Sequence, residues 1–166
     1  MARQQIGGWQ AGANEIYVKK DYGAVGDGVA DDTTPITNAL AAVTARRGAI
    51  LCFEPGRYKV PGGVSCTTNG IYVKGLGSRS LGPGGQSANL GAVIVASTTG
   101  AWAWNQQQSV GETGNEYFGN VFENLTFEGD ADTAGGLLLR TNYNIVRDCC
   151  AYKNLTGVGF MTDAPA

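Results

Sequence analysis

The sequence predicts an all-β fold, a right-handed parallel β-helix of short strands, with a single α-helix near the N-terminus. Three observations lead to this prediction. The 166 residues include 26 glycines but only five prolines, which favours many tight turns between short strands over disorder. Short apolar segments are flanked by Gly, Asn, Asp or Ser, and part of this pattern repeats along the chain.

The internal repeat has an offset of roughly 20 to 24 residues, the length of one coil in a stacked-repeat fold. The segment NLTF at 124–127 corresponds to RDCCA at 147–151, and GLLL at 136–139 corresponds to GVGF at 157–160. These partial matches fit a fold in which each coil lays its strands on the previous coil and buries an apolar ladder inside.

The elements follow one another in a simple order along the chain. Residues 1–15 are polar, glycine-rich and without period, as is typical of an N-terminal arm. A first strand at 15–19 precedes the loop DYGAVGDGVADD at 21–32, and the helix follows the loop. From Gly48 onward the pattern changes from helix to strand. The remaining strands are expected at 49–53, 58–60, 71–73, 92–95, 121–127, 137–139, 144–147 and 158–160.

A helix is expected at about 34–47, because this segment has apolar residues at helical spacing and residues typical of both helix ends. Thr34 is suited to cap the N-terminus, and Asp31 and Asp32 lie where the helix dipole favours negative charge. Gly48 is suited to end the helix. The apolar face, at i, i+4 and i+7, consists of Ile36, Leu40 and Val43.

Composition and charge exclude several classes of function. Net charge is −2 and the isoelectric point is near 5.0, which gives no electrostatic case for nucleic acid or an anionic membrane. The chain has no histidine, so it cannot build a Ser-His-Asp or Cys-His site. The four cysteines lack CxxC spacing, so we expect no zinc site and buried or half-buried thiols. No apolar run has the length of a signal peptide or a membrane span, so we expect no membrane insertion.

Three segments at 21–43, 48–60 and 71–80 resemble the start of a known superfamily. They read DYGAVGDGVADDTTPITNALAAV, GAILCFEPGRYKV and IYVKGLGSRS. In this order they closely resemble the N-terminal signature of the pectate-lyase-like β-helix superfamily. That group includes polygalacturonase-type glycoside hydrolases, exo-glucanases and many bacteriophage tailspikes. The resemblance covers about 16–160 and is strongest over 16–80.

The resemblance implies an architecture more than a chemistry. The helix at 34–47 would cap the open end of the coils and hide strand edges and core from water. The β-helix domain would span 16–166, with coils from about 49 onward, either complete or as part of a longer protein. The cap motif comprises Asp21, Tyr22, Gly23, Gly26, Asp27, Gly28, Asp31 and Asp32.

The glycines and aspartates near the helix admit two other interpretations. Asp27, Asp31 and Asp32 offer the oxygen ligands that calcium takes, but their spacing does not fit an EF-hand loop and capping explains all three. The segment GLGSR at 75–79 resembles part of a phosphate-binding loop, but a loop follows it instead of a helix. We therefore predict no metal site and no cofactor.

Carboxylates on or beside the predicted coils are candidates for glycoside hydrolysis, which uses two Asp or Glu residues flanking the bond. They are Glu123, Glu128, Asp130, Asp132 and Asp148. Glu123 and Asp148 could project from neighbouring coils with Arg147 near them. We take Glu123, Glu128 and Asp148 as the catalytic candidates; the alternative is charge on a solvated outer face.

Trp102 and Trp104 would place both indoles on one face of an extended segment, and Tyr117 and Phe118 follow them. Exposed aromatic rings suit a carbohydrate-binding platform, because an apolar ring with a polar edge matches a sugar face. Packing inside a coil, or against a neighbouring subunit, is the alternative.

We expect a bacteriophage virion structural protein, a tailspike or tail-fibre component that recognises host-surface glycan or attaches to the tail. The chain has room for only a few coils and no recognisable C-terminal capping helix, so a homotrimer would bury the outer coil faces. Residues 1–15 would contact other tail proteins. The protein would be located in the virion tail after assembly in the host cytoplasm.

The alternative function is a secreted enzyme, a polysaccharide lyase or glycoside hydrolase that depolymerises bacterial surface or pectin-like polysaccharide. A glycan-binding module without chemistry is a third interpretation. For this chain by itself we favour a protein without enzymatic activity.

Overall fold

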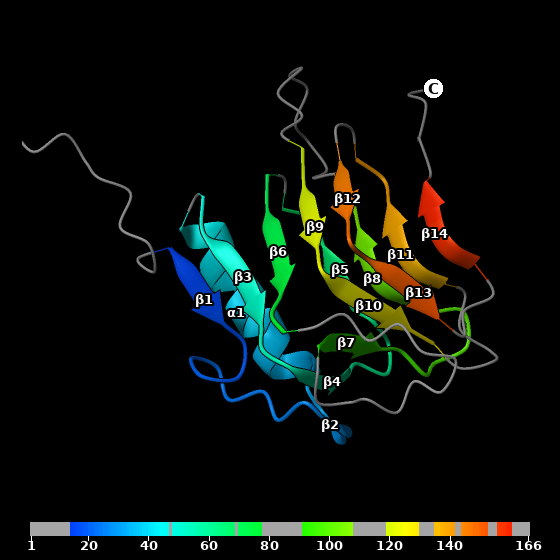
Figure 1. Ribbon diagram of the computed structural model, residues 1–166, viewed down its shortest axis with the longest axis horizontal. Helices are drawn as coiled ribbons and strands as arrows, with labels where there is room; N and C mark the ends of the chain where they lie inside the picture. Colours follow the sequence, from blue (N-terminus) through cyan, green and yellow to red (C-terminus); the bar gives the residue numbers. More distant parts are fainter. Residues whose placement is uncertain are drawn as a thin grey trace, which may run out of the picture.

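The computed structural model describes residues 14–46, 48–68, 70–77, 91–107, 119–129, 135–141, 144–152 and 156–160. Within these ranges the chain forms one α-helix and strands in three parallel sheets (Figure 1). The prediction of an all-β fold with one short helix is therefore confirmed.

Three sheets, which we name A, B and C, contain all the strands that are described. Sheet A contains, in spatial order, β1 (Glu15–Tyr17), β3 (Ile50–Phe53), β6 (Tyr72–Gly75), β9 (Val121–Glu123) and β12 (Ile145–Arg147). Sheet B contains β13 (Cys150–Tyr152), β10 (Leu125–Glu128), β7 (Ala92–Val95), β4 (Gly56–Lys59) and β2 (Asp27–Asp31). Sheet C contains β14 (Thr156–Phe160), β11 (Gly135–Leu139), β8 (Trp102–Gln106) and β5 (Val64–Cys66).

The chain visits the sheets in a fixed order. From β3 onward it passes through sheets A, B and C and then returns to sheet A, with each new strand parallel to the strand of the previous pass. The registers continue without a shift from β3 to β12, where Ile50, Tyr72, Val121 and Ile145 align across sheet A. Residues at the same position in neighbouring strands of a sheet therefore lie side by side and form straight rows across the sheet.

The core lies between the three sheets and is built from large aromatic side chains. Phe53 of sheet A packs edge-to-face against Tyr58 of sheet B and Trp104 of sheet C, with ring centroids 5.1 and 6.5 Å apart. Trp104 in turn meets Phe122 of sheet A at 5.7 Å. Such pairs contribute roughly 0.5–1.5 kcal/mol each beyond the burial of their surface. The aromatic chain thus ties all three sheets into one interior.

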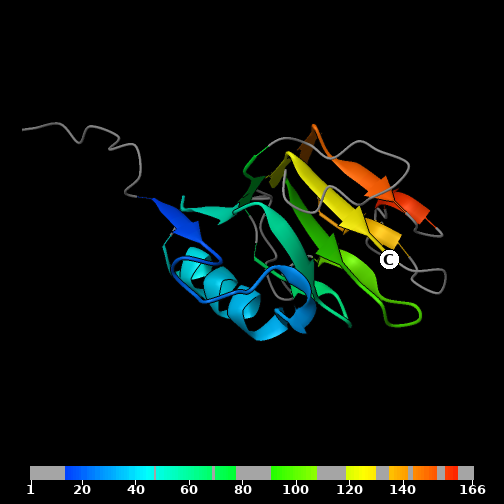
Figure 2. The same ribbon diagram turned by 60° about the horizontal axis from the view of Figure 1, so that its bottom comes forward.

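Helix α1 (Thr33–Ala45) lies beside the first strands, at the end of the sheets opposite β12–β14 (Figure 2). Its buried face consists of Ile36, Ala39, Leu40 and Val43, which confirms the predicted apolar face. The predicted cap at Thr34 is wrong, because the N-cap position is Asp32 and Thr34 lies inside the helix. Gly48 follows the helix with φ +83°. No helix in the described part of the chain has the length and apolarity of a membrane span.

The sequence missed four short strands, β2, β5, β8 and β13, although it placed most of the others. Strand β2 was predicted as loop because its residues alternate between exposed and half-buried and give no apolar period. It pairs with β4 at the edge of sheet B, and the register shifts between its first and last residues. Pairing with a neighbour distant in sequence, and not local propensity, makes this segment a strand.

Candidate functional site

The outer face of sheet A carries a cluster of polar side chains that includes Glu123, one of the predicted catalytic candidates. Alternate residues of each strand point inward, as shown by the buried Leu51, Val73 and Phe122. Their neighbours point outward and form two parallel rows. One row is Glu15, Ile50, Tyr72, Val121 and Ile145. The other row is Tyr17, Cys52, Lys74, Glu123 and Arg147.

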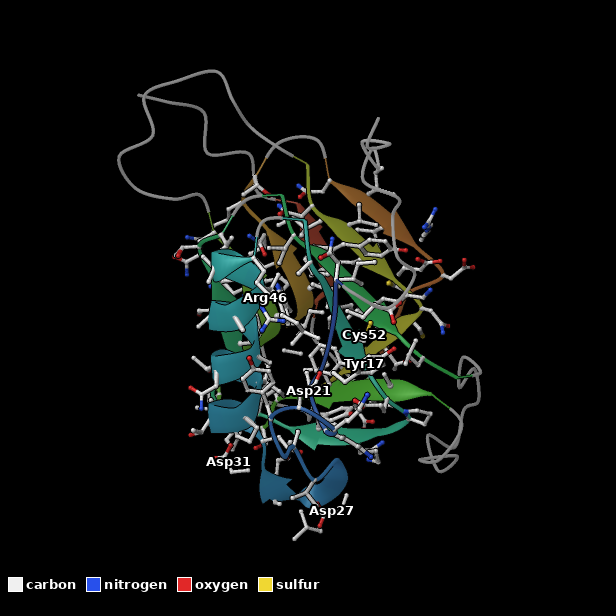
Figure 3. The ribbon with its side chains drawn as sticks, turned by 90° about the vertical axis from the view of Figure 1, so that its left-hand side faces the viewer. Tyr17, Asp21, Asp27, Asp31, Arg46 and Cys52 are labelled. Atoms are coloured by element: carbon white, nitrogen blue, oxygen red, sulfur yellow. The ribbon has the colours of Figure 1, made fainter. Side chains whose placement is uncertain are left out.

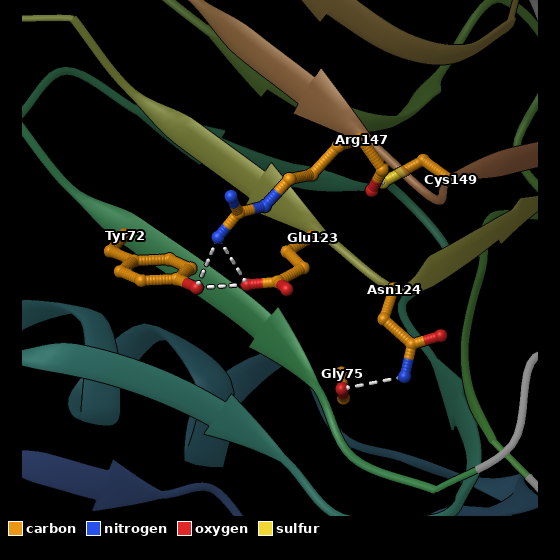
Figure 4. A network of polar contacts seen from close by, with 6 residues as sticks. All are labelled: Tyr72, Gly75, Glu123, Asn124, Arg147 and Cys149. Carbon is orange, nitrogen blue, oxygen red and sulfur yellow. Dashed lines mark hydrogen bonds and ion pairs between the residues drawn. The ribbon is translucent and has the colours of Figure 1, made fainter.

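Tyr72, Glu123 and Arg147 form a closed set of hydrogen bonds on this face (Figure 4). The Tyr72 hydroxyl donates to Oε2 of Glu123. Nη2 of Arg147 donates to the same oxygen at 3.0 Å and to the Tyr72 hydroxyl oxygen at 3.1 Å. The Arg147 side chain remains 54% exposed and that of Glu123 22% exposed, so solvent reaches the cluster.

The contacts within this cluster shift the pKa values of all three side chains. The hydrogen bond from Tyr72 and the ion pair with Arg147 lower the pKa of Glu123, against an opposing effect of desolvation. Desolvation and the bond to Glu123 raise the pKa of Tyr72, and Glu123 raises the pKa of Arg147. At neutral pH the cluster therefore holds a carboxylate, a neutral phenol and a guanidinium. A general acid requires a raised carboxyl pKa, so Glu123, predicted only as a catalytic candidate, is poorly suited to act as the general acid of a glycoside hydrolase.

Glu128, the second catalytic candidate, lies on sheet B and not on the face that carries Glu123. It forms an ion pair with Arg57 of β4 at 2.7 Å, and the two side chains are 8% and 22% exposed. The structure therefore does not bring Glu123 and Glu128 together as a pair of carboxylates. Each glutamate is paired with an arginine of its own sheet.

Asp148, the third candidate, occupies a turn between sheets A and B. Its φ is 54°, the same as that of Asn124 at the corresponding turn of the previous pass. Asn and Asp tolerate this left-handed conformation better than other side chains that carry a Cβ atom. The Asn124 amide also donates to the carbonyls of Gly75 and Gly77, each at 2.9 Å. The turn geometry explains the residue type at 148, and sequence reasoning missed this signal.

Trp104 cannot serve as a sugar platform, because its side chain is completely buried. Its indole N–H donates to Gln106 inside the core at 3.3 Å. Trp102 is half-buried, so the predicted pair of exposed indoles is wrong for Trp104 and stays a prediction for Trp102. Other predicted candidates, Asp130, Asp132, Tyr117 and Phe118, lie outside the described residues.

The predicted cap motif is a set of backbone contacts around the start of α1. Asp32 accepts hydrogen bonds from the N–H groups of residues 25 and 26, and Asp27 from those of residues 29 and 30. Asp31 accepts from the N–H of residue 33 and Asp21 from that of residue 17. These backbone bonds lower the pKa of Asp27, and contacts with residue 33 lower that of Asp31.

The other members of the cap motif either adopt backbone conformations that favour glycine or pack against the core. Gly23, Gly26 and Gly28 have φ of +74°, +64° and +81°, which favours glycine. Tyr22 is partly buried and packs against the core. Figure 3 shows Asp21, Asp27 and Asp31 spread along the chain instead of converging on one point.

The cysteines of the described residues are free thiols. Cys52 and Cys66 are buried, whereas Cys149 and Cys150 are half-buried, as expected. Burial raises the pKa of Cys52 to about 12 and also raises the pKa of Cys66 and Cys149. A thiol that stays protonated is a poor nucleophile, so these three residues do not supply one.

Comparison with curated proteins finds mannuronan C5-epimerases of Azotobacter vinelandii. The chain is 30% identical to epimerase AlgE5 over an alignment of 132 residues, and the match covers 72% of this chain and 11% of AlgE5. It is 31% identical to AlgE1 over 117 residues, 70% of this chain and 8% of AlgE1. With AlgE4 the identity is 39% over 67 residues, 37% of this chain and 12% of AlgE4. The matched part is thus about a tenth of the length of these relatives. No family model matches the chain, and no solved structure matches it significantly.

Proposed function

We propose that the chain forms the first coils of a right-handed parallel β-helix and engages an acidic polysaccharide, mannuronan or a related polyuronate. The handedness follows from the general rule that connections between parallel strands of one sheet are right-handed in nearly all proteins. The fixed order of sheets A, B and C, with parallel strands throughout, supports the coil architecture. The position of α1 near the first strands supports its role as a cap.

The observation that carries the proposed ligand is the similarity to mannuronan C5-epimerases over about 70% of the chain. Bulk charge does not favour an acidic ligand, because the chain itself has a net charge of −2. Binding must therefore depend on local cationic side chains and on apolar surface, which a coil face can present together.

Engagement of the polymer, and not turnover, is the function that we propose for this chain. Epimerisation at C5 removes a proton next to a carboxylate and returns it on the other face, so it needs a proton acceptor and a proton donor. Glu123 is ionised but paired, and the raised pKa of Tyr72 makes its phenol a donor and a poor base. The cluster of Tyr72, Glu123 and Arg147 thus does not supply both partners of such a reaction.

The tailspike interpretation gains no support from these relatives, because they are epimerases and not virion proteins. A homotrimer, contacts through residues 1–15 and a location in the virion tail therefore stay predictions from the sequence. The same holds for a secreted lyase or glycoside hydrolase.

The test is a calorimetric titration of the 166-residue protein with mannuronan oligomers of uniform length, with polygalacturonate and with dextran as a neutral reference. We expect saturable binding to the polyuronates that weakens as salt is added, and none to dextran. Absence of binding to any polyuronate at low salt, with the protein folded by circular dichroism, would overturn the proposal. NMR spectra of mannuronan incubated with the protein in D₂O would show deuterium at C5 if turnover also occurs.

A further inference from the structure

We propose that the outer face of sheet A is the polyuronate-binding surface, with Arg147 and Lys74 receiving carboxylates of the polymer. The inference rests on the proposed function and assigns that function to a surface. It depends on the arrangement of charge, on the free donors of Arg147 and on the apolar row beside them.

The charged row has a cation on each side of one carboxylate. Lys74, Glu123 and Arg147 align in register on β6, β9 and β12. Adjacent strands are about 4.8 Å apart, so the two cations stand on strands roughly 10 Å from each other. With Glu123 between them the three residues keep one net positive charge on a chain whose total is −2. The row is thus locally attractive to an anionic polymer although the protein as a whole is not.

Arg147 is held in place while most of its donors still face solvent. Nη2 makes both of its hydrogen bonds, to Glu123 and Tyr72, and the side chain is 54% exposed. Nη1 and Nε have no partner among the described residues, and each can donate a charge-assisted hydrogen bond to a carboxylate oxygen. Since Glu123 and Tyr72 already order the side chain, binding costs less conformational entropy than with a freely moving arginine.

Lys74 supplies the second cation. It is half-buried and has no hydrogen-bond or ion-pair partner among the described residues. Its charge reaches Glu123, since it contributes to the lowered pKa of that carboxyl. Its ammonium group is therefore available to a ligand without breaking a contact of the described structure.

The neighbouring row offers apolar surface next to the cations. Beyond Glu15 at the β1 edge, it consists of Ile50, Tyr72, Val121 and Ile145. Ile145 is 54% exposed and lies two residues before Arg147 on β12. The apolar faces of pyranose rings pack on such side chains while their carboxylates reach charged groups. Among the residues that the structure describes, the other large exposed apolar side chains are Val25 and Val29, which lie in the segment before α1 and outside sheet A.

The test measures affinity for mannuronan oligomers in variants that change one charge each. Arg147→Gln and Lys74→Gln should each weaken binding about tenfold at low salt, the effect of losing a charge-assisted hydrogen bond. Arg147→Lys should lose less than Arg147→Gln, because lysine keeps the positive charge although it lacks the guanidinium donors. Glu123→Gln should strengthen binding about threefold, because it keeps an acceptor for Arg147 and removes the competing negative charge.

Lys59→Gln is the matched control, because it removes one positive charge from sheet B and should change affinity less than about twofold. If the sheet A variants, shown to be folded, bind like Lys59→Gln, the inference is overturned while the proposed function stands. If Glu123→Gln weakens binding as much as Arg147→Gln, the charge argument is also overturned. If the unchanged protein binds no polyuronate, the proposed function itself fails, so the two failures are distinguishable.

Discussion

Sheets A and B each carry an arginine–glutamate pair, and the two pairs differ in how much water reaches them. On sheet A, Arg147 is 54% exposed beside Glu123 at 22%. On sheet B, Arg57 is 22% exposed beside Glu128 at 8%. An exposed ion pair contributes little to stability and exchanges partners easily, whereas a largely buried pair cannot lose one partner without leaving a desolvated charge. We therefore expect the same residue types to serve ligand binding on one sheet and folding on the other.

The two tryptophans of β8 also differ in how far water reaches them, although they lie on the same strand. Trp104 is completely buried and contacts Phe53 and Phe122, while Trp102 keeps part of its surface in solvent. Burial therefore decides whether an aromatic ring or a charged group is part of the fold or available to a ligand.

The largest expected effect is on the core. Trp104→Ala should lower the free energy of unfolding by about 4 kcal/mol, because it removes a buried ring and leaves a cavity between all three sheets. Trp102→Ala should cost less than about 2 kcal/mol, since its ring is only half-buried. Urea denaturation followed by circular dichroism measures both. Equal losses of unfolding free energy in the two variants would contradict the conclusion that Trp104 contributes more to the core than Trp102.

The second-largest expected effect is a difference in stability between variants of Arg57 and Arg147. Arg57→Met should lower the free energy of unfolding by about 2 kcal/mol, because Glu128 keeps its charge in a largely buried place without the arginine. Arg147→Met should leave the urea midpoint almost unchanged, because its pair is open to solvent. The comparison fails if Arg147→Met shifts the midpoint as far as Arg57→Met does.

A smaller effect is expected at the turn that contains Asp148. Asp148→Ala should cost about 1 kcal/mol, because alanine adopts the left-handed conformation less readily than aspartate. Asp148→Asn should keep both the turn and mannuronan affinity, measured by the same denaturation and by calorimetry. A loss of affinity in a stable Asp148→Asn protein would return this residue to the candidate site.

The smallest effect concerns pH. The folded-state pKa of Glu123 is lowered below its usual 4.5, so the stability from this cluster is fully present above that value and is lost as pH falls through the folded pKa. Carbon-13 NMR of the Glu123 carboxyl should therefore show a midpoint below 4.5. Tyr72→Phe should raise the midpoint, because the hydrogen bond from Tyr72 is the largest cause of the shift. An unchanged midpoint would show that the phenol does not hold the carboxylate.

Local patterns in the sequence were sufficient for the class of fold and for one helix face. The spacing of Ile36, Leu40 and Val43 marks which side of α1 is buried, because helical periodicity is a property of adjacent turns. Glycine-bounded apolar segments likewise predicted most strands. Local patterns were insufficient for β2, whose strand conformation depends on pairing with β4.

The candidate site was only partly predictable for the same reason. Glu123 and Arg147 could be placed near each other from the repeat, but Tyr72 was not identified, because it lies 51 residues before Glu123 in sequence. The repeat also placed Asp148 on the coil after Glu123 without revealing that its backbone has a left-handed conformation, which aspartate tolerates.

The sequence by itself determined that the chain folds from short strands and one amphipathic helix, because periodicity and turn residues act over a few neighbouring positions. Only the tertiary structure decided which charged and aromatic side chains face water. That outcome depends on the register between strands many residues apart, and a shift of one residue would move every side chain of a strand to the opposite face.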